Sequence, residues 1–248
     1  MIKTFSEDRL RAYAVCSYLE KEYGRVASVD PIFTIVKTTI EKLVLQQMKN
    51  EIMDLHESIG FILYDVAKPF VDRMTDESMK KKLFMRASNF IAKFFEYFTP
   101  DKYVPVFGNY IAPYRSGDIN IKLEFSAIYK DIKSNTVHYV SFFPLLTNMN
   151  PKLDLPTLAK IDFTSQIKIN KHTDVKLHLF DLDFLNIVRY NVLNDNTTIR
   201  HEIIEEDLSE DDRHFFNTTL EQIAIKGLYK IPYCQNYYCP IRKACQQK

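Results

Sequence analysis

The chain has little glycine, no tryptophan, and no cysteine between Cys16 and Cys234. Only 5 of its 248 residues are glycine, so we expect long regular elements rather than many tight turns. The sequence also lacks an uninterrupted apolar run of roughly eighteen residues, the length that a membrane-spanning helix requires. Its first residues carry charges where a signal peptide would be apolar. These absences predict a soluble, intracellular (cytoplasmic) protein that does not enter membranes.

The charges balance, because 33 lysines and arginines face 32 aspartates and glutamates, for a net charge of +1. This balance excludes avid nucleic-acid binding through bulk charge, although a local basic patch is compatible with it. No glycine-rich loop precedes a predicted helix, so a phosphate cradle and a nucleotide-driven motor are not expected. The 6 histidines also lack the spacing of an HExxH metal site.

The first hundred residues are predicted to be helical. Helix starts are expected where a capping residue precedes acidic residues or proline: Ser6 before Glu7 and Asp8, Asp30 before Pro31, and Thr75 before Asp76. Gly24 is the expected stop of the first helix. Apolar residues recur at helical spacing after the second and third starts: Ile32, Ile35, Val36, Ile40, Leu43, Val44, Met48, and then Leu83, Phe84, Ala87, Phe90, Ile91, Phe94, Phe95. Such stripes are typical of helices that pack into a core.

The middle of the chain is predicted to form a sheet with a helix behind it. Segments rich in β-branched and aromatic residues predict strands at 103–107, 120–129, 136–145, 175–182 and 184–193, with a hairpin loop at 130–135. Residues 155–169 are predicted to be a helix. An acidic stretch from Glu202 to Asp212 is expected to be a loop and helix start, in which Ser209 and Asp212 form a capping box. That last helix should end at Gly227.

Three of the 4 cysteines lie in the last fifteen residues, and this clustering is the strongest chemical signal in the sequence. In a reducing compartment, clustered cysteines indicate metal binding rather than disulfides. Zinc sites usually draw close pairs from one short segment, whereas a distant cysteine with a three-cysteine tail is less typical of zinc. Four thiolates also suit a 4Fe–4S cluster. Unrelated buried cysteines would not explain the concentration in the tail.

The end of the chain carries a family resemblance. A helix from Leu220 to Gly227, followed by LYKIPYCQNYYCPIRKAC, resembles the C-terminus of the RecB-like, iron–sulfur branch of the PD-(D/E)XK nucleases. That branch includes AddB-type helicase-nucleases and CRISPR-adaptation exonucleases. The resemblance implies a 4Fe–4S cluster, with zinc as the alternative, whose ligands are an N-terminal and three C-terminal cysteines: Cys16, Cys234, Cys239 and Cys245.

The active site that the resemblance implies has no counterpart in this sequence. The family places an aspartate on one strand and a D/E-x-K sequence on the next, because two carboxylates hold the metal and the lysine orients the attacking water. Aligned on the strands, these positions fall at Ser126 and at Ser141 to Phe143. The family's early histidine falls at Thr38 and Thr39. We therefore expect no catalytic residues.

Two D-x-K sequences occur elsewhere, but their number is no more than chance predicts. The first, Asp131-Ile132-Lys133, falls in the predicted hairpin loop. The second, Asp174-Val175-Lys176, opens a predicted strand and has Asp118 or Asp162 as conceivable partners in a displaced site. Glu124 lies on the same strand face as Ser126 and is a further stray carboxylate, which could bind metal weakly or simply face solvent.

The tail mixes tyrosines with basic residues, a composition that could stack bases and contact phosphates, or could pack around the cluster. Four residues are the candidates for nucleic-acid binding: Lys230, Tyr237, Arg242 and Lys243.

The sequence thus predicts one domain over 1–248, with a helical part at 1–100, a sheet core at 101–200, and a final helix and cluster-binding tail at 201–248. Its expected fold is α/β, a PD-(D/E)XK-like mixed sheet flanked by helices. The expected function is binding of DNA, or of a partner protein in a DNA-processing or transcription assembly, without cleavage. The alternatives are an active divalent-metal-dependent DNA exonuclease and a zinc-stabilised protein-interaction module.

Overall fold

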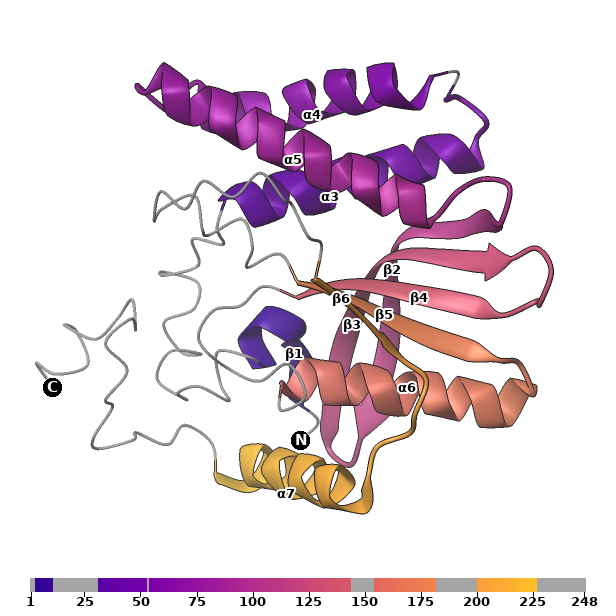
Figure 1. Cartoon of the computed structure of the whole chain (residues 1–248). Coiled ribbons are helices and arrows are strands. Elements are labelled where there is room, and N and C mark those ends of the chain that lie inside the picture. Colours follow the sequence, from indigo (N-terminus) through magenta and orange to yellow (C-terminus); the bar gives the residue numbers. More distant parts are fainter. Residues whose placement is uncertain (1–2, 11–30, 53, 144–153, 182–199, 227–248) are drawn as a thin grey trace, which may run out of the picture.

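A mixed sheet of six strands lies between two layers of helices (Figure 1). The computed structural model describes residues 3–10, 31–52, 54–143, 154–181 and 200–226. The elements, in chain order, are β1 (Lys3–Ser6), α3 (Pro31–Met48), α4 (Leu55–Val71), α5 (Glu77–Tyr97), β2 (Tyr103–Ser116), β3 (Ile119–Asp131), β4 (Val137–Phe143), α6 (Leu155–Lys171), β5 (Val175–Asp181), β6 (Arg200–Ile204) and α7 (Glu210–Lys226). Residues 7–10 are also helical. The predicted α/β class with a mixed sheet is confirmed.

Helices α3, α4 and α5 form the layer on one face of the sheet. The predicted apolar stripe of α3 is confirmed, since five of its residues are fully buried: Ile35, Val36, Ile40, Leu43 and Val44. Met48, predicted to belong to this stripe, is 39% exposed. The third predicted helix exists, but its cap is Asp76 rather than Thr75, because the Asp76 carboxylate accepts hydrogen bonds from the backbone N–H groups of Ser78 and Met79.

Helix α4 was not predicted. It contains Gly60 and Pro69, two residues that weaken a helical pattern in the sequence. The Asp54 carboxylate nevertheless caps its start by accepting from the N–H of Glu57. Packing of its apolar face against α3 and α5 then stabilises it, with Ile59, Leu63 and Ala67 each at most 2% exposed.

The sheet has the order β1-β3-β4-β5-β6, with β2 on the other side of β3. Strands β2, β3 and β4 are antiparallel neighbours, and β5 returns parallel to β4 after α6. The predicted hairpin loop is confirmed between β3 and β4, where the Asp131 carboxylate accepts from the N–H groups of Lys133 and Ser134. Strand β2 is much longer than the predicted segment at 103–107.

Two hydrophobic cores fill the spaces on either side of the sheet. One joins the sheet to α3, α4 and α5, and the other joins it to α6 and α7 (Figure 1). Phe125 of β3 belongs to the second core, whereas Ala127, two residues later, belongs to the first. The side-chain alternation of β3 therefore shifts at Ser126. On β2, Asn109 lies between the partners of these two residues and has a φ of 53°, a conformation that asparagine tolerates.

The remaining elements include two strands that were not predicted, a predicted helix cap that is present, and two predictions that lie outside the described residues. Strands β1 and β6 were not predicted; β6 occupies the start of the acidic stretch that was expected to be a loop. Helix α7 begins at Glu210, where Ser209 and Asp212 form the predicted capping pair. The predicted strand at 184–193 and the predicted stop at Gly24 lie outside the described residues.

None of the helices in the described part combines the length and apolarity that crossing a lipid bilayer demands.

Candidate functional site

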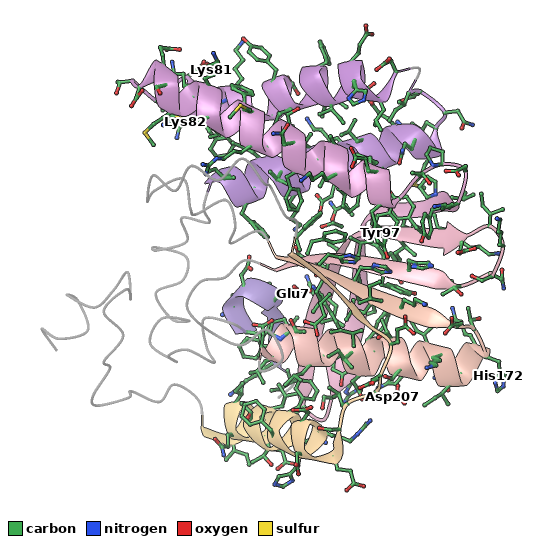
Figure 2. All side chains as sticks on the ribbon, in the orientation of Figure 1. Glu7, Lys81, Lys82, Tyr97, His172 and Asp207 are labelled. Atoms are coloured by element: carbon green, nitrogen blue, oxygen red, sulfur yellow. The ribbon has the colours of Figure 1, made fainter. Side chains whose placement is uncertain are left out.

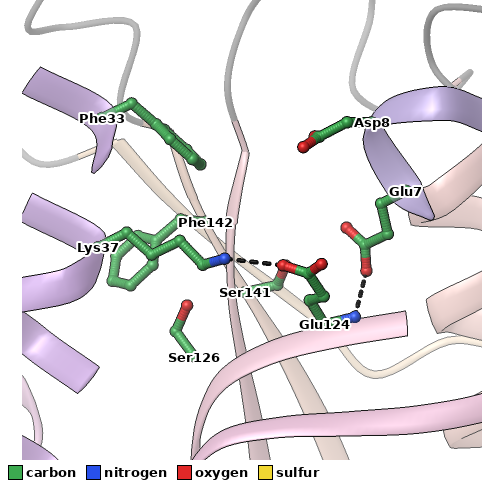
Figure 3. A pocket seen from close by; sticks show the side chains of 8 residues that line it. All are labelled: Glu7, Asp8, Phe33, Lys37, Glu124, Ser126, Ser141 and Phe142. Atoms are coloured by element: carbon green, nitrogen blue, oxygen red, sulfur yellow. Dashed lines mark hydrogen bonds and ion pairs between the residues drawn. The ribbon is translucent and has the colours of Figure 1, made fainter. Parts of the chain in front are cut away.

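A pocket opens where two strands share one edge of β3. Residues 119–122 of β3 pair with β1, and residues 127–130 pair with β4 on the same edge. Between these stretches, the Glu124 N–H donates instead to the Glu7 carboxylate at 2.5 Å, directly after the end of β1. A cleft between several elements that carries a few polar side chains is a common place for a binding site. Eight residues line the pocket (Figure 3): Glu7, Asp8, Phe33, Lys37, Glu124, Ser126, Ser141 and Phe142.

A buried ion pair joins the pocket residue Glu7 to Lys160. The Lys160 ammonium, on α6, is 2.8 Å from both oxygens of the Glu7 carboxylate and donates to the Ser141 hydroxyl at 2.5 Å. Lys160 is 1% exposed and Glu7 is 5% exposed. Because an isolated charge is costly to bury, removing either partner would leave an uncompensated charge in the interior.

A second set of charges comes from α3 and faces β3. The Lys37 ammonium lies 2.8 Å from the Glu124 carboxylate and 3.7 Å from that of Glu41 (Figure 3 shows the first contact). Burial alone would lower the pKa of Lys37, but these two carboxylates raise it. Burial raises the pKa of Glu41, an effect that Lys37 only partly offsets. The lysine is therefore held in its charged form, and the pKa of one of its two carboxylate partners, Glu41, is raised.

The family resemblance places metal-binding carboxylates at two strand positions where this chain has serine. Both positions lie in the same pocket. Ser126 and Ser141, on neighbouring strands β3 and β4, both line it. Glu124, which was predicted to share a strand face with Ser126, also lines it. Ser141 contacts the Lys160 ammonium, so a lysine reaches this place from α6 rather than from the strand.

The stray acidic residues that were considered as a displaced site have separate surroundings. Asp118 lies in the turn before β3, whereas Asp174 lies before β5 and accepts from the Thr136 hydroxyl. Asp162 accepts from the Tyr114 hydroxyl and pairs with Arg213 on the α7 side of the sheet. The carboxylates of Asp162 and Asp174 thus each have a structural partner, and the three residues do not form one site. In the described part of the chain, no three histidine, cysteine, aspartate or glutamate side chains are arranged to hold a metal ion.

The predicted cluster ligands and the predicted nucleic-acid contacts all lie outside the described residues. This holds for both sets: Cys16, Cys234, Cys239 and Cys245, and Lys230, Tyr237, Arg242 and Lys243.

The roles of Glu7, Lys37 and Lys160 were not predicted from the sequence. Glu7 was noted only as an acidic residue at a helix start, and the two lysines carried no local signal. Their isolated charges do interrupt apolar helical stretches, for example Lys160 within LPTLAKIDF, and such an interruption is a weak sign of a buried charge. No protein-family model matches this chain, and no curated protein matches it significantly.

Proposed function

We propose that this chain is a nuclease-like protein that binds DNA, or a partner in a DNA-processing or transcription assembly, without cleaving nucleic acid. The proposal includes the PD-(D/E)XK-like fold and the 4Fe–4S cluster that the resemblance implies. The order of elements agrees with it: an antiparallel sheet, a helix, a further parallel strand and a final helix follow a helical N-terminal part.

One observation carries the proposal. Ser126 and Ser141 lie together in the pocket at the two strand positions where a nuclease of this kind would need carboxylates. Serine hydroxyls are weak ligands for magnesium, which binds through carboxylates and water. The remaining strand carboxylate, Glu124, is engaged by the Lys37 ammonium at 2.8 Å. A divalent cation would have to displace that lysine to bind there.

A second candidate function is favoured by a different observation in the same pocket. The carboxylates of Glu7 and Glu124 both reach it, and the Lys160 ammonium contacts Glu7 and Ser141. Two acids and a lysine are the side-chain types of a metal-dependent nuclease, supplied here from other elements. An active DNA exonuclease would use these residues rather than Asp118, Asp162 or Asp174.

The two functions are separated by incubating anaerobically purified protein with end-labelled single- and double-stranded DNA plus magnesium or manganese. We expect retarded DNA without shortened products. Cleavage that a chelator abolishes, and that is lost in Glu7→Gln and Glu124→Gln, would establish the active enzyme instead. Cleavage that survives both substitutions would contradict the assignment of Glu7 and Glu124 as catalytic residues, and absence of both binding and cleavage would contradict the DNA-binding proposal.

A further inference from the structure

The outer face of α4 and α5 exposes an unusual amount of apolar and aromatic surface. Phe61 is 78% exposed, Tyr64 is 59% exposed and Met85 is 53% exposed. Phe61 and Tyr64 belong to α4 and Met85 to α5, two neighbouring helices of the same layer (Figure 1). Single exposed apolar residues are ordinary, but several on adjoining helix faces mark an interaction site.

One of the exposed rings on this face packs against the neighbouring helix. Tyr64 stacks on Phe84 across the two helices, with ring centroids 6.2 Å apart and an angle of 21° between the planes. Phe61 precedes Tyr64 by one helical turn, so the two exposed rings follow the same face of α4. A rigid ring loses little conformational entropy when a flat ligand stacks on it.

Cationic side chains flank these rings. Lys68 lies one turn after Tyr64 on α4, and Lys81 lies one turn before Met85 on α5; both are exposed. Figure 2 shows Lys81 and Lys82 near one end of α5. Neither Lys68 nor Lys81 has an ion-pair partner among the described residues. The acidic neighbour Asp65 is paired with Lys42 at 3.2 Å.

We infer that this α4–α5 surface, formed by Phe61, Tyr64, Lys68, Lys81, Phe84 and Met85, binds single-stranded DNA. The inference rests on the proposed DNA-binding function and names the surface that performs it. Unstacked bases would lie on the Phe61 and Tyr64 rings, while the ammonium groups of Lys68 and Lys81 contact the phosphates. Rings interspersed with unpaired cations are the combination that non-specific single-strand binding uses.

An acidic protein segment is the other polyanion that lysines attract. It would need the cations but would not need flat rings, because carboxylate side chains do not stack. The exposed pair of Phe61 and Tyr64 therefore favours DNA. Duplex DNA is also less suitable, since its bases are already stacked on one another and are not free to stack on an aromatic ring.

The test measures fluorescence anisotropy of a labelled oligothymidylate of about 20 nucleotides with the full chain, in the presence of chelator. We expect Phe61→Ala/Tyr64→Ala to weaken binding by about thirtyfold or more, since it removes two base stacks that each contribute roughly 1 kcal/mol or more. For Lys68→Ala/Lys81→Ala, we expect a salt dependence of log Kd that is lower by about 0.7 for each lost phosphate contact.

Matched controls come from the opposite side of the sheet. Phe215→Ala on α7 removes a ring that is 43% exposed, and Lys168→Ala/Lys171→Ala on α6 removes two exposed charges. Both should bind like the unchanged protein. Binding that is unaffected by the α4–α5 substitutions would overturn this inference and leave the proposed function intact. No binding by the unchanged protein would overturn both. Equal affinity for polyglutamate, unaffected by loss of the rings, would assign the surface to an acidic protein partner instead.

Discussion

The Lys160 ammonium lies 2.8 Å from the Glu7 carboxylate, although 153 residues separate them in the sequence. Glu7 follows β1 and Lys160 lies on α6, so this contact joins the first described segment to the helix that follows β4. The same Glu7 carboxylate accepts from the backbone of β3 in the stretch between its pairings with β1 and β4. Glu7 thus connects the end of β1, the middle of β3 and helix α6 beside the candidate site.

We predict that Lys160→Met destabilises the protein by about 3–5 kcal/mol, because it leaves the buried Glu7 carboxylate without a counter-charge. The free energy of unfolding from urea titration measures the effect. The double variant Glu7→Gln/Lys160→Met should regain much of the loss, since no charge then remains buried. Lys168→Met, an exposed change on the same helix, should cost less than about 1 kcal/mol. If Lys160→Met were as mild as this control, the ion pair would not stabilise the fold.

Three histidines form a hydrogen-bonded chain across β4, β5 and β6. His138 Nδ1 lies 2.8 Å from His178 Nε2, and His178 Nδ1 lies 2.8 Å from His201 Nε2. The chain packs against aromatic rings of Tyr97 and Phe180. Burial lowers the pKa of His178 to about 2, with a smaller contribution from its two histidine neighbours, and burial lowers that of His201 to about 4. Burial also lowers the pKa of His138.

We predict from these three hydrogen-bonded histidines that the protein loses stability as the pH falls below about 6.5. The unfolded histidines take up protons there, whereas the folded ones stay neutral until about pH 4 at His201 and about pH 2 at His178. Each histidine that stays neutral should cost about 1.4 kcal/mol of unfolding free energy between pH 7.5 and 5.5. The nearby charges of Asp131, Asp174, Lys176 and Glu205 also act on His138.

Urea titrations over that pH range measure this dependence. His178→Phe should reduce it by about the share of one histidine, about 1.4 kcal/mol. The exposed His56 serves as the control, and His56→Gln should leave the dependence unchanged. An identical pH dependence in the His178 variant would show that the hydrogen-bonded histidines do not control acid stability.

Gly108 is the point at which α3 crosses β2. A Cβ atom there would lie 2.9 Å from Leu45 Cγ and 3.2 Å from the Glu41 carbonyl oxygen. We therefore predict that Gly108→Ala destabilises the protein by about 1–3 kcal/mol, because α3 would have to move away from the sheet. Gly60→Ala is the matched control: its Cβ would meet nothing within 4 Å, and alanine should stabilise helix α4 by about 0.5–1 kcal/mol. Thermal or urea unfolding of both variants checks the opposite signs.

The cysteine proposal predicts a brown protein that contains iron and sulfide after anaerobic purification. Removing any of Cys16, Cys234, Cys239 or Cys245 should abolish the broad visible absorption, since four thiolates hold a 4Fe–4S cluster. Metal analysis and absorption spectra of the single Cys→Ala variants measure this. A colourless protein with stoichiometric zinc would support the zinc-stabilised interaction module, and protein without either metal would contradict both.

The sequence by itself determined the elements whose signals are local. Helix α3 begins at Pro31 and buries the predicted stripe, Asp131 turns the predicted hairpin, and Ser209 caps α7 because each signal acts within a few residues. Local signals also explain the small errors: Asp76 caps α5 better than its neighbour Thr75, and Gly60 obscured α4.

Only the tertiary structure decided the candidate site and the edges of the sheet. Strands β1 and β6 are short, and their pairing with β3 and β5 stabilises them more than their own residues do. Glu7, Lys37, Glu124 and Lys160 come from four separate elements, and no spacing in the chain links them. A buried charge is tolerated only when its partner is placed beside it. That placement depends on how β1, β3 and α6 pack together, which the order of residues along the chain does not specify locally.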